Sequence, residues 1–189
     1  MREAWDLYPN HFPDVAAYGG CVGMTACVIV AAQRRGIKLV PQAGDCQWLM
    51  VTPEHDDGVS PTHIAYKFEG LRHPAVVQCI LDGVLPELHV WATDPQSRYV
   101  VDGTTRFLPD QAIHLLGPVE GRWRAPEPPE WLWRKRSKCM RFDCLYRADT
   151  DATAFVVSNF INLAIDAVIN GRPFRPRDFL YIPQPVSTP

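Results

Sequence analysis

An almost unbroken run of apolar residues dominates the hydrophobic pattern of the chain. Between Val22 and Gln33 the only polar side chain is Thr25. This is too apolar for a helix with one face in water, so the pattern predicts a central helix that is covered on most sides. We expect the helix to end at Arg34-Arg35-Gly36, because cations favour the negative end of the helix dipole and glycine readily adopts a left-handed cap.

Shorter apolar stretches, separated by turn residues, follow this helix and predict strands. The predicted strands are Cys46–Thr52, Thr62–Glu69, Val76–Leu81, Glu87–Thr93 and Arg98–Val101. A buried helix followed by an antiparallel meander is typical of an α+β fold.

The C-terminal part of the chain has a different pattern. Val119–Glu130 is rich in proline and predicts an irregular strap, whereas Thr150–Asn170 has a helical pattern that Gly171 brings to an end. We therefore expect a core over residues 1–118. Residues 119–189 are expected to form a strap and a helix that pack on this core rather than an independent domain.

Composition narrows the possible functions only in part. The chain has 189 residues, 47% of them hydrophobic, which is enough for one domain with a sizeable core. Its net charge of -2 gives no general reason to expect nucleic acid or an anionic membrane as a partner. No apolar stretch reaches the roughly 18 residues of a membrane span, and the N-terminal residues lack the order of a secretory signal. We therefore expect a cytoplasmic protein whose six cysteines are reduced.

A tight turn in the middle of the chain sets the register of a predicted hairpin. Asp94-Pro95-Gln96-Ser97 suits such a turn, because aspartate is favoured at its first position and proline at its second. With the turn closed at these residues, His89 faces Asp102 and Trp91 faces Val100. Directly opposite residues have Cβ atoms about 4.5–5.5 Å apart, close enough for an imidazole to hydrogen-bond a carboxylate. The register predicts a His–Asp pair, in which the carboxylate orients the imidazole as a general base requires.

A cysteine, Cys21, stands at the expected start of the central helix, directly after Gly19 and Gly20. The unpaired N–H groups and partial positive charge of a helix N-terminus favour the thiolate of a cysteine placed there. The same N–H groups can receive the oxyanion that forms when a thiolate attacks a carbonyl. The two glycines leave room for a substrate next to the backbone. Cys21 is therefore the candidate nucleophile.

A set of short motifs extends over roughly Tyr18–Thr105, with its chemical residues in the order Cys, His, Asp. The set comprises Cys21 at a helix start, Gly36-Ile37, Gly44, His89-Val90-Trp91 and Val101-Asp102-Gly103-Thr104. In combination these motifs resemble the transglutaminase-like branch of the papain-like cysteine hydrolase superfamily. The resemblance implies a papain-like core, with a central helix packed on an antiparallel sheet. It also implies Cys21 as nucleophile, His89 as general base and then acid, and Asp102 as the orienting group.

The sequence also departs from the pattern of this family. Gly20 stands where many members have a polar or aromatic residue, Gly103 where a proline often follows the aspartate, and Thr93 where an acidic residue is frequent. Gly19-Gly20-Cys21 and Tyr99-Val100-Val101-Asp102 partly echo the related arylamine N-acetyltransferases. Subfamily and substrate therefore stay open.

The predicted activity is cysteine-dependent hydrolysis of an amide bond, by a peptidase or deamidase, through a thioester acyl-enzyme. Acyl transfer to an amine, of the transglutaminase or arylamine N-acetyltransferase type, is the enzymatic alternative. We assign Tyr18, Gly20 and Trp91 to the substrate-binding or oxyanion part of the site. A protein or peptide is the expected substrate, and no metal or organic cofactor is implied.

A competing class of function rests on a basic, tryptophan-rich segment. Arg122–Arg141 carries seven basic residues against two acidic ones, together with three tryptophans, a composition that can bind single-stranded nucleic acid. We favour tryptophans packed on the core with solvated arginines, and we keep a non-catalytic module that binds a protein or nucleic acid as the alternative. His63 is a second candidate base, and the spacing of Cys139 and Cys144 is a weak metal-site signal.

Overall fold

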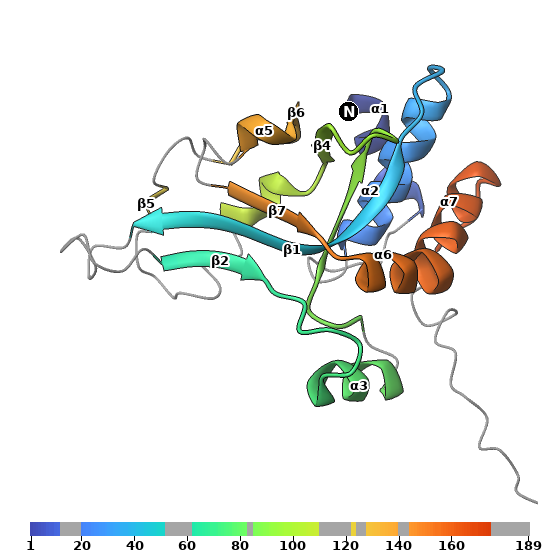
Figure 1. Ribbon diagram of the computed structural model, residues 1–189. Helices are drawn as coiled ribbons and strands as arrows, with labels where there is room; N and C mark the ends of the chain where they lie inside the picture. The colour runs from blue at the N-terminus through green and yellow to red at the C-terminus, as the bar shows by residue number, and fades with distance from the viewer. Residues whose placement is uncertain are drawn as a thin grey trace, which may run out of the picture.

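The apolar run forms helix α2, Gly20–Gln33, in which nearly every side chain is buried. The computed structural model describes residues 1–11, 20–51, 62–82, 85–109, 122–123, 128–139 and 144–174, and in it this helix lies between the strands and α7 (Asn162–Ile169) (Figure 1). The helix packs against α1 (Arg2–His11) and α7. The predicted glycine cap is confirmed, since Gly36 has a φ of 72°.

An antiparallel sheet packs against α2. Its strands are β1 (Val40–Val51), β2 (Thr62–Tyr66), β3 (His89–Thr93), β4 (Tyr99–Asp102), β5 (Arg122–Trp123), β6 (Leu132–Lys135) and β7 (Cys144–Ala148). Hydrogen bonds join them in the order β2-β1-β3-β4-β6, and β5 and β7 also pair with β1. Together with the helices, the sheet makes an α+β fold, as predicted.

The long strand β1 changes partners near Gly44. Residues 40–44 pair with β3, residues 46–50 with β2, and residues 44–48 with β7 on the other edge. Gly44 has a φ of 152°, and a Cβ at this position would lie 2.7 Å from the backbone nitrogen of Asp149 and in conflict with the carbonyl of Arg147. Only glycine allows the strands to approach so closely here.

Alternate residues of the strands divide the interior into two clusters, one on each face of the sheet. Val90 and Ala92 of β3 point toward α1, α2 and α7 and belong to the larger cluster. His89 and Trp91 point to the other face, where Trp91 belongs to a smaller cluster of buried side chains that includes Tyr146. The side chains of the candidate dyad therefore extend from the face of the sheet opposite to that of Val90 and Ala92.

The prediction of a strand over Val76–Leu81 is wrong. This stretch belongs to helix α3, Pro74–Leu81, in which only Val76 is buried. Pro74 at the first position is preorganised for a helix, and a short apolar stretch cannot distinguish strand from helix by its period. In Figure 1, α3 lies away from the sheet and the other helices.

The C-terminal region contributes to the sheet as well as to the helical layer. Strands β6 and β7 and the short helix α5 (Arg136–Cys139) were not predicted. Of the predicted strap, the described residues Arg122–Trp123 pair with the end of β1.

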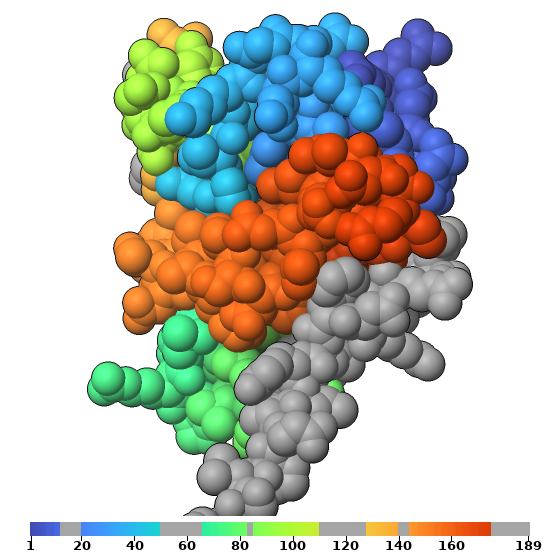
Figure 2. Space-filling model, turned by 90° about the vertical axis from the view of Figure 1, so that its right-hand side faces the viewer, coloured from blue at the N-terminus to red at the C-terminus, as the bar shows by residue number. Residues whose placement is uncertain are grey.

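The predicted C-terminal helix is present, but one segment has a wider turn. α6 (Thr150–Val156) leads into a π-helical segment (Val157–Ile161) and then α7, and Gly171 ends the helix with a φ of 65°. Figure 2 shows this stretch covering one side of the molecule below α2. By length and composition alone, the helical stretch Thr150–Ile169 could cross a membrane, with a mean hydropathy of 1.7. We had expected no such segment, because no uninterrupted run of apolar residues in the sequence is long enough. Core helices pass the same test, and α7 packs on α2.

Candidate functional site

A hydrogen bond between His89 and Asp102 lies at the centre of the candidate site. Imidazole Nε2 is 2.7 Å from carboxylate Oδ2, and the two residues are only 3% and 2% exposed. His89 is the first residue of β3 and Asp102 is the last residue of β4. The predicted His–Asp hydrogen bond is confirmed.

The register that brings the pair together differs from the predicted one. Ala92 pairs with Val101, so in the ladder Trp91 rather than His89 stands opposite Asp102. The strands are displaced by two residues, which keeps every side chain on its original face. His89 therefore reaches Asp102 diagonally, over a distance that a ring side chain can span.

The hairpin turn explains this displacement. The N–H of Ser97 donates to the carbonyl of Asp94 at 2.8 Å, as a tight turn requires, but Ser97 has a left-handed φ of 54°. The carboxylate of Asp94 then accepts the backbone N–H groups of Arg98 and Tyr99 at 2.6 and 3.0 Å. Because of these bonds, the turn takes up more residues on the side of β4 than on the side of β3, which displaces the two strands relative to each other. The spacing of the turn residues in the sequence does not reveal this effect.

Asp102 is held by four hydrogen bonds. Its Oδ1 accepts the backbone N–H and the hydroxyl of Thr104 at 2.8 and 2.6 Å. Its Oδ2 accepts the hydroxyl of Tyr146, at 2.8 Å, in addition to the bond from His89. A carboxylate offers about four lone-pair sites, so this one is saturated and its orientation is determined.

The electrostatics of the pair favour an imidazolium beside a carboxylate. Burial opposes the charge of Asp102, but the charge of His89 and the hydrogen bonds from His89 and Thr104 outweigh it and lower the pKa of Asp102. Burial also opposes a charged His89, but the carboxylate of Asp102 outweighs it and raises the pKa of His89 well above its ordinary value. Cys46 lies nearby, yet burial raises the pKa of its thiol to about 12, so near neutral pH it stays uncharged. Asp102 is therefore the charge that acts on His89.

Aromatic rings fix the plane of the imidazole. The ring of Tyr66 stacks on His89 with 5.1 Å between centroids, and the ring of Trp91 lies nearly parallel at 6.2 Å. Trp91 is only 1% exposed and also packs edge-on against Tyr146. The predicted assignment of Trp91 to the substrate-binding surface is therefore wrong, because the indole is enclosed in the core behind His89.

Cys21, in the first turn of α2, lies near the imidazole of His89. Among the described residues, the buried Nδ1 of His89 has no hydrogen-bond partner of ordinary geometry. The half-buried Cys21 is nevertheless close enough for its side chain to contribute to the raised pKa of His89. Because Asp102 occupies Nε2, Nδ1 is the nitrogen available for proton exchange with the thiol. Such contacts often tighten only when a substrate binds.

Comparisons with known proteins bear on the fold alone. No family model matches the chain, and neither does any curated protein. It is similar to a solved protein described as the crystal structure of genomics APC5867, with a TM-score of 0.50 and 12% identity, over 97% of this chain and 80% of that one. This similarity supports the α+β fold. The resemblance to transglutaminase-like enzymes stays a prediction.

Gly20, which we assigned to the substrate-binding or oxyanion part of the site, lies beside the side chain of Tyr8. A Cβ on Gly20 would lie 2.8 Å from the hydroxyl oxygen of Tyr8. The space left by the missing side chain is therefore next to a protein hydroxyl and is not simply open to a substrate. Gly19 and Tyr18, the other predicted members of this region, lie outside the described residues.

The remaining described cysteines differ from Cys21 in their surroundings. Cys27, Cys46, Cys139 and Cys144 are buried, whereas Cys79 on α3 is half-buried. Cys144 donates a hydrogen bond to the carbonyl of Cys139 at 3.1 Å. The described residues hold no group of three or more His, Cys, Asp or Glu side chains placed to bind a metal.

Sequence reasoning missed three tyrosines from other parts of the chain, two beside the dyad and one beside Gly20. Tyr146 comes from β7, Tyr66 from the end of β2, and Tyr8 from α1. Positions 144 and 146 of β7 are buried and position 147 is exposed, as in a strand with one face in the core. Nothing in the local sequence indicates which side chain a tyrosine hydroxyl meets.

Proposed function

We propose that this protein is a cysteine-dependent amide hydrolase, a peptidase or deamidase that acts through a thioester acyl-enzyme. One observation carries the proposal: a buried imidazole, oriented by a saturated carboxylate, has a nitrogen with no hydrogen-bond partner among the described residues, and a half-buried cysteine at a helix start is close enough to act on that imidazole. Buried polar atoms are normally hydrogen-bonded, so a His89 nitrogen with no partner in the part of the chain that the structure describes favours a functional role over a purely structural one.

The proposed reaction has two halves. The sulfur of Cys21 attacks the carbonyl carbon, forming a C–S bond as the carbonyl electrons move to oxygen. The oxyanion then collapses, the C–N bond breaks, and His89 gives its proton to the departing nitrogen. In the second half His89 takes a proton from water, the resulting oxygen attacks the thioester, and the C–S bond breaks to restore Cys21. Asp102 stays ionised throughout and stabilises the imidazolium.

The same residues can also transfer the acyl group to an amine. We favour water as the acceptor, and a protein or peptide as the substrate. Mass spectrometry of the products with and without a primary amine such as putrescine would distinguish the two outcomes. Exclusive formation of the amine adduct would replace hydrolase with acyltransferase.

The decisive test of the proposal is the pH dependence of alkylation by iodoacetamide, followed cysteine by cysteine by mass spectrometry. An imidazolium next to a thiol favours the thiolate, which is the reactive form. An ordinary thiol with a pKa of about 8.5 is only roughly 0.3% thiolate at pH 6. We expect Cys21 to react at pH 6 at least about tenfold faster than Cys79, which is also half-buried and serves as an internal control.

Two variants link the reactivity to the dyad. In His89→Gln and Asp102→Asn, the rate of Cys21 should fall to that of Cys79. If the buried Cys27 stays protected from alkylation in each variant, the fold is intact. Equal rates for Cys21 and Cys79 in the wild-type protein at pH 6 would exclude the proposed activity.

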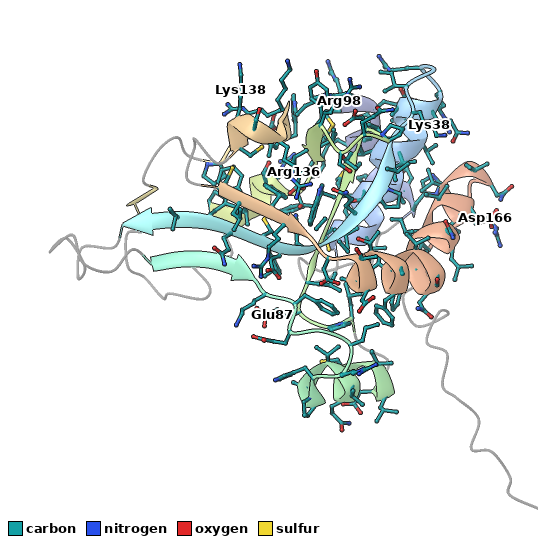
Figure 3. The ribbon with its side chains drawn as sticks, in the orientation of Figure 1. Lys38, Glu87, Arg98, Arg136, Lys138 and Asp166 are labelled. Atoms are coloured by element: carbon teal, nitrogen blue, oxygen red, sulfur yellow. The ribbon has the colours of Figure 1, made fainter. Side chains whose placement is uncertain are left out.

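A non-catalytic binding module is the second candidate, favoured by two exposed tryptophans. Trp131 and Trp133 lie at or next to β6, the last strand in the order of the sheet, and are 39% and 43% exposed. This exposure contradicts our expectation that they pack on the core. Lys135 and Lys138 are also exposed, and Figure 3 shows Lys138 pointing outward. Arg136, by contrast, donates a hydrogen bond to the carbonyl of Tyr146.

Charge reversal can therefore be restricted to the two lysines. If Lys135→Glu with Lys138→Glu abolishes binding of a single-stranded oligonucleotide or of a protein partner, the binding function is supported. Cys21→Ala should leave such binding unchanged. Failure to bind single-stranded nucleic acid or protein above background would exclude this second function.

A further inference from the structure

The N-terminal helix α1 brings a tyrosine hydroxyl to the start of the helix that carries the nucleophile. Glu3 forms ion pairs with Arg34 and Arg35 just beyond the C-terminal end of α2, at 3.3 and 3.1 Å. Tyr8, farther along α1, meets the opposite end of α2 at Gly20. The two helices therefore run in opposite directions.

The C-terminal end of α1 is also anchored. The ring of His11 is hydrogen-bonded to the carbonyl of Arg172 at 3.0 Å, and its backbone carbonyl accepts the N–H of Phe174 at 2.6 Å. Ala4, also on α1, is completely buried in the larger core cluster. These contacts hold α1 at both ends, so the position of Tyr8 is set by the fold and not by a free terminus.

The hydroxyl of Tyr8 is next to the first residue of α2. A Cβ on Gly20 would be 2.8 Å from the hydroxyl oxygen but 3.9 Å from Cζ of the ring, so the oxygen is the atom closest to the backbone there. Tyr8 is only 9% exposed. The first turn of a helix also presents backbone N–H groups that lack partners within the helix. A side-chain hydroxyl and backbone donors thus meet beside Cys21.

The protonation state of Tyr8 suits a donor. Burial, together with the charges of Cys21 and Cys27, raises the pKa of Tyr8 to about 12. The hydroxyl therefore keeps its hydrogen over the whole neutral range.

We infer that Tyr8 is a further catalytic residue whose hydroxyl donates a hydrogen bond to the oxyanion that forms when Cys21 attacks a carbonyl. The inference rests on the proposed function, and it names the side-chain member of the oxyanion site. Gly20 is glycine because the hydroxyl occupies the space that a side chain would fill. No atom is transferred to or from Tyr8, which only stabilises negative charge as it develops on the carbonyl oxygen.

Two reagents separate this role from the nucleophilicity of Cys21. Iodoacetamide alkylates a thiolate by displacement at an sp³ carbon and forms no oxyanion. The acyl ester p-nitrophenyl acetate reacts through a tetrahedral oxyanion, and its acylation step is followed by the burst of p-nitrophenol. Tyr8→Phe should lower the acylation rate constant by about 10²-fold, the effect of losing one oxyanion donor. Alkylation of Cys21 at pH 6 should change less than threefold.

A double-mutant cycle tests the geometry directly. Gly20→Ala places a methyl group 2.8 Å from the Tyr8 oxygen and should displace the hydroxyl, lowering acylation about as much as Tyr8→Phe does. In the Tyr8→Phe background the nearest ring atom is 3.9 Å away, an ordinary contact, so Gly20→Ala should have no further effect. Tyr99→Phe, on β4, is the matched control and should leave both reactions unchanged.

The possible outcomes distinguish the inference from the function on which it rests. Ordinary alkylation of Cys21 in the wild-type protein overturns the proposed function and this inference with it. Fast, His89-dependent alkylation with an acylation rate in Tyr8→Phe within threefold of wild type overturns the inference alone. Additive effects of Gly20→Ala and Tyr8→Phe would show that the hydroxyl and the glycine act separately, which also contradicts it.

Discussion

Removal of the Tyr146 hydroxyl tests whether the C-terminal strand stabilises the dyad. Tyr146→Phe deletes one hydrogen bond of 2.8 Å to the carboxylate of Asp102 and keeps the ring that packs against Trp91. Hydrogen bonds to charged groups contribute about 1.5–3 kcal/mol. Because Asp102 keeps its bonds from His89 and Thr104, the carboxylate is not left without partners. We expect the free energy of unfolding to fall by about 1.5–3 kcal/mol.

The assay is urea denaturation at pH 6, between the ordinary pKa values of 3.8 for aspartic acid and 6.5 for histidine. Asp102 has a lowered pKa in the folded state, so its stabilisation is present above pH 3.8 and is lost as the pH falls through the folded-state pKa. The difference between wild type and Tyr146→Phe should therefore shrink on acidification. Tyr99→Phe, which alters a half-buried tyrosine on β4, is the control. A difference below about 0.5 kcal/mol at pH 6 is typical of surface substitutions and would refute the assigned hydrogen bond.

Three further predictions concern the dyad and the frame that carries it. Because the pKa of His89 is raised in the folded state, the charged imidazole stabilises the fold fully below pH 6.5, and this stabilisation is lost as the pH rises through the folded-state pKa. The difference in free energy of unfolding between wild type and Asp102→Asn, measured by denaturation, should therefore decline from pH 6 to 9. A difference that grows with pH would contradict this assignment. Gly44→Ala should prevent folding or lower the melting temperature sharply, because a Cβ there conflicts with the carbonyl of Arg147; a melting temperature within about 2 °C of wild type would contradict it. Asp149 is the N-cap of α6, and its carboxylate accepts the backbone N–H of Ala152 at 2.8 Å. Asp149→Ala should lower the free energy of unfolding by about 0.5–2 kcal/mol, whereas Asp149→Asn should keep most of this stability.

The comparison with the sequence is instructive at the hairpin. The turn residues Asp94 and Ser97 predicted that His89 and Asp102 share a face and bond to each other, and they do. The detailed alignment was wrong by two residues because the Asp94 carboxylate extends the turn. The prediction of the pair survived because side chains alternate with a period of two, so an even displacement keeps the face.

The central helix was the most predictable element. Its apolar run requires burial on nearly all sides, and the structure confirms both its start near Cys21 and its glycine cap at Gly36. α3 was mistaken for a strand, since eight residues do not carry enough periodicity to separate the two structures. Local pattern therefore decides a long buried element and fails for a short one.

The sequence by itself determined the buried central helix, the hairpin and the candidate residues Cys21, His89 and Asp102, because these depend on local periodicity and turn chemistry. Only the tertiary structure decided what surrounds them. Tyr146 lies 44 positions from Asp102 along the chain, yet its hydroxyl saturates the carboxylate, and Tyr8 meets Gly20 through the packing of two helices. Such contacts are set by how distant elements bury their apolar faces together, and no short stretch of sequence specifies which polar atoms then meet.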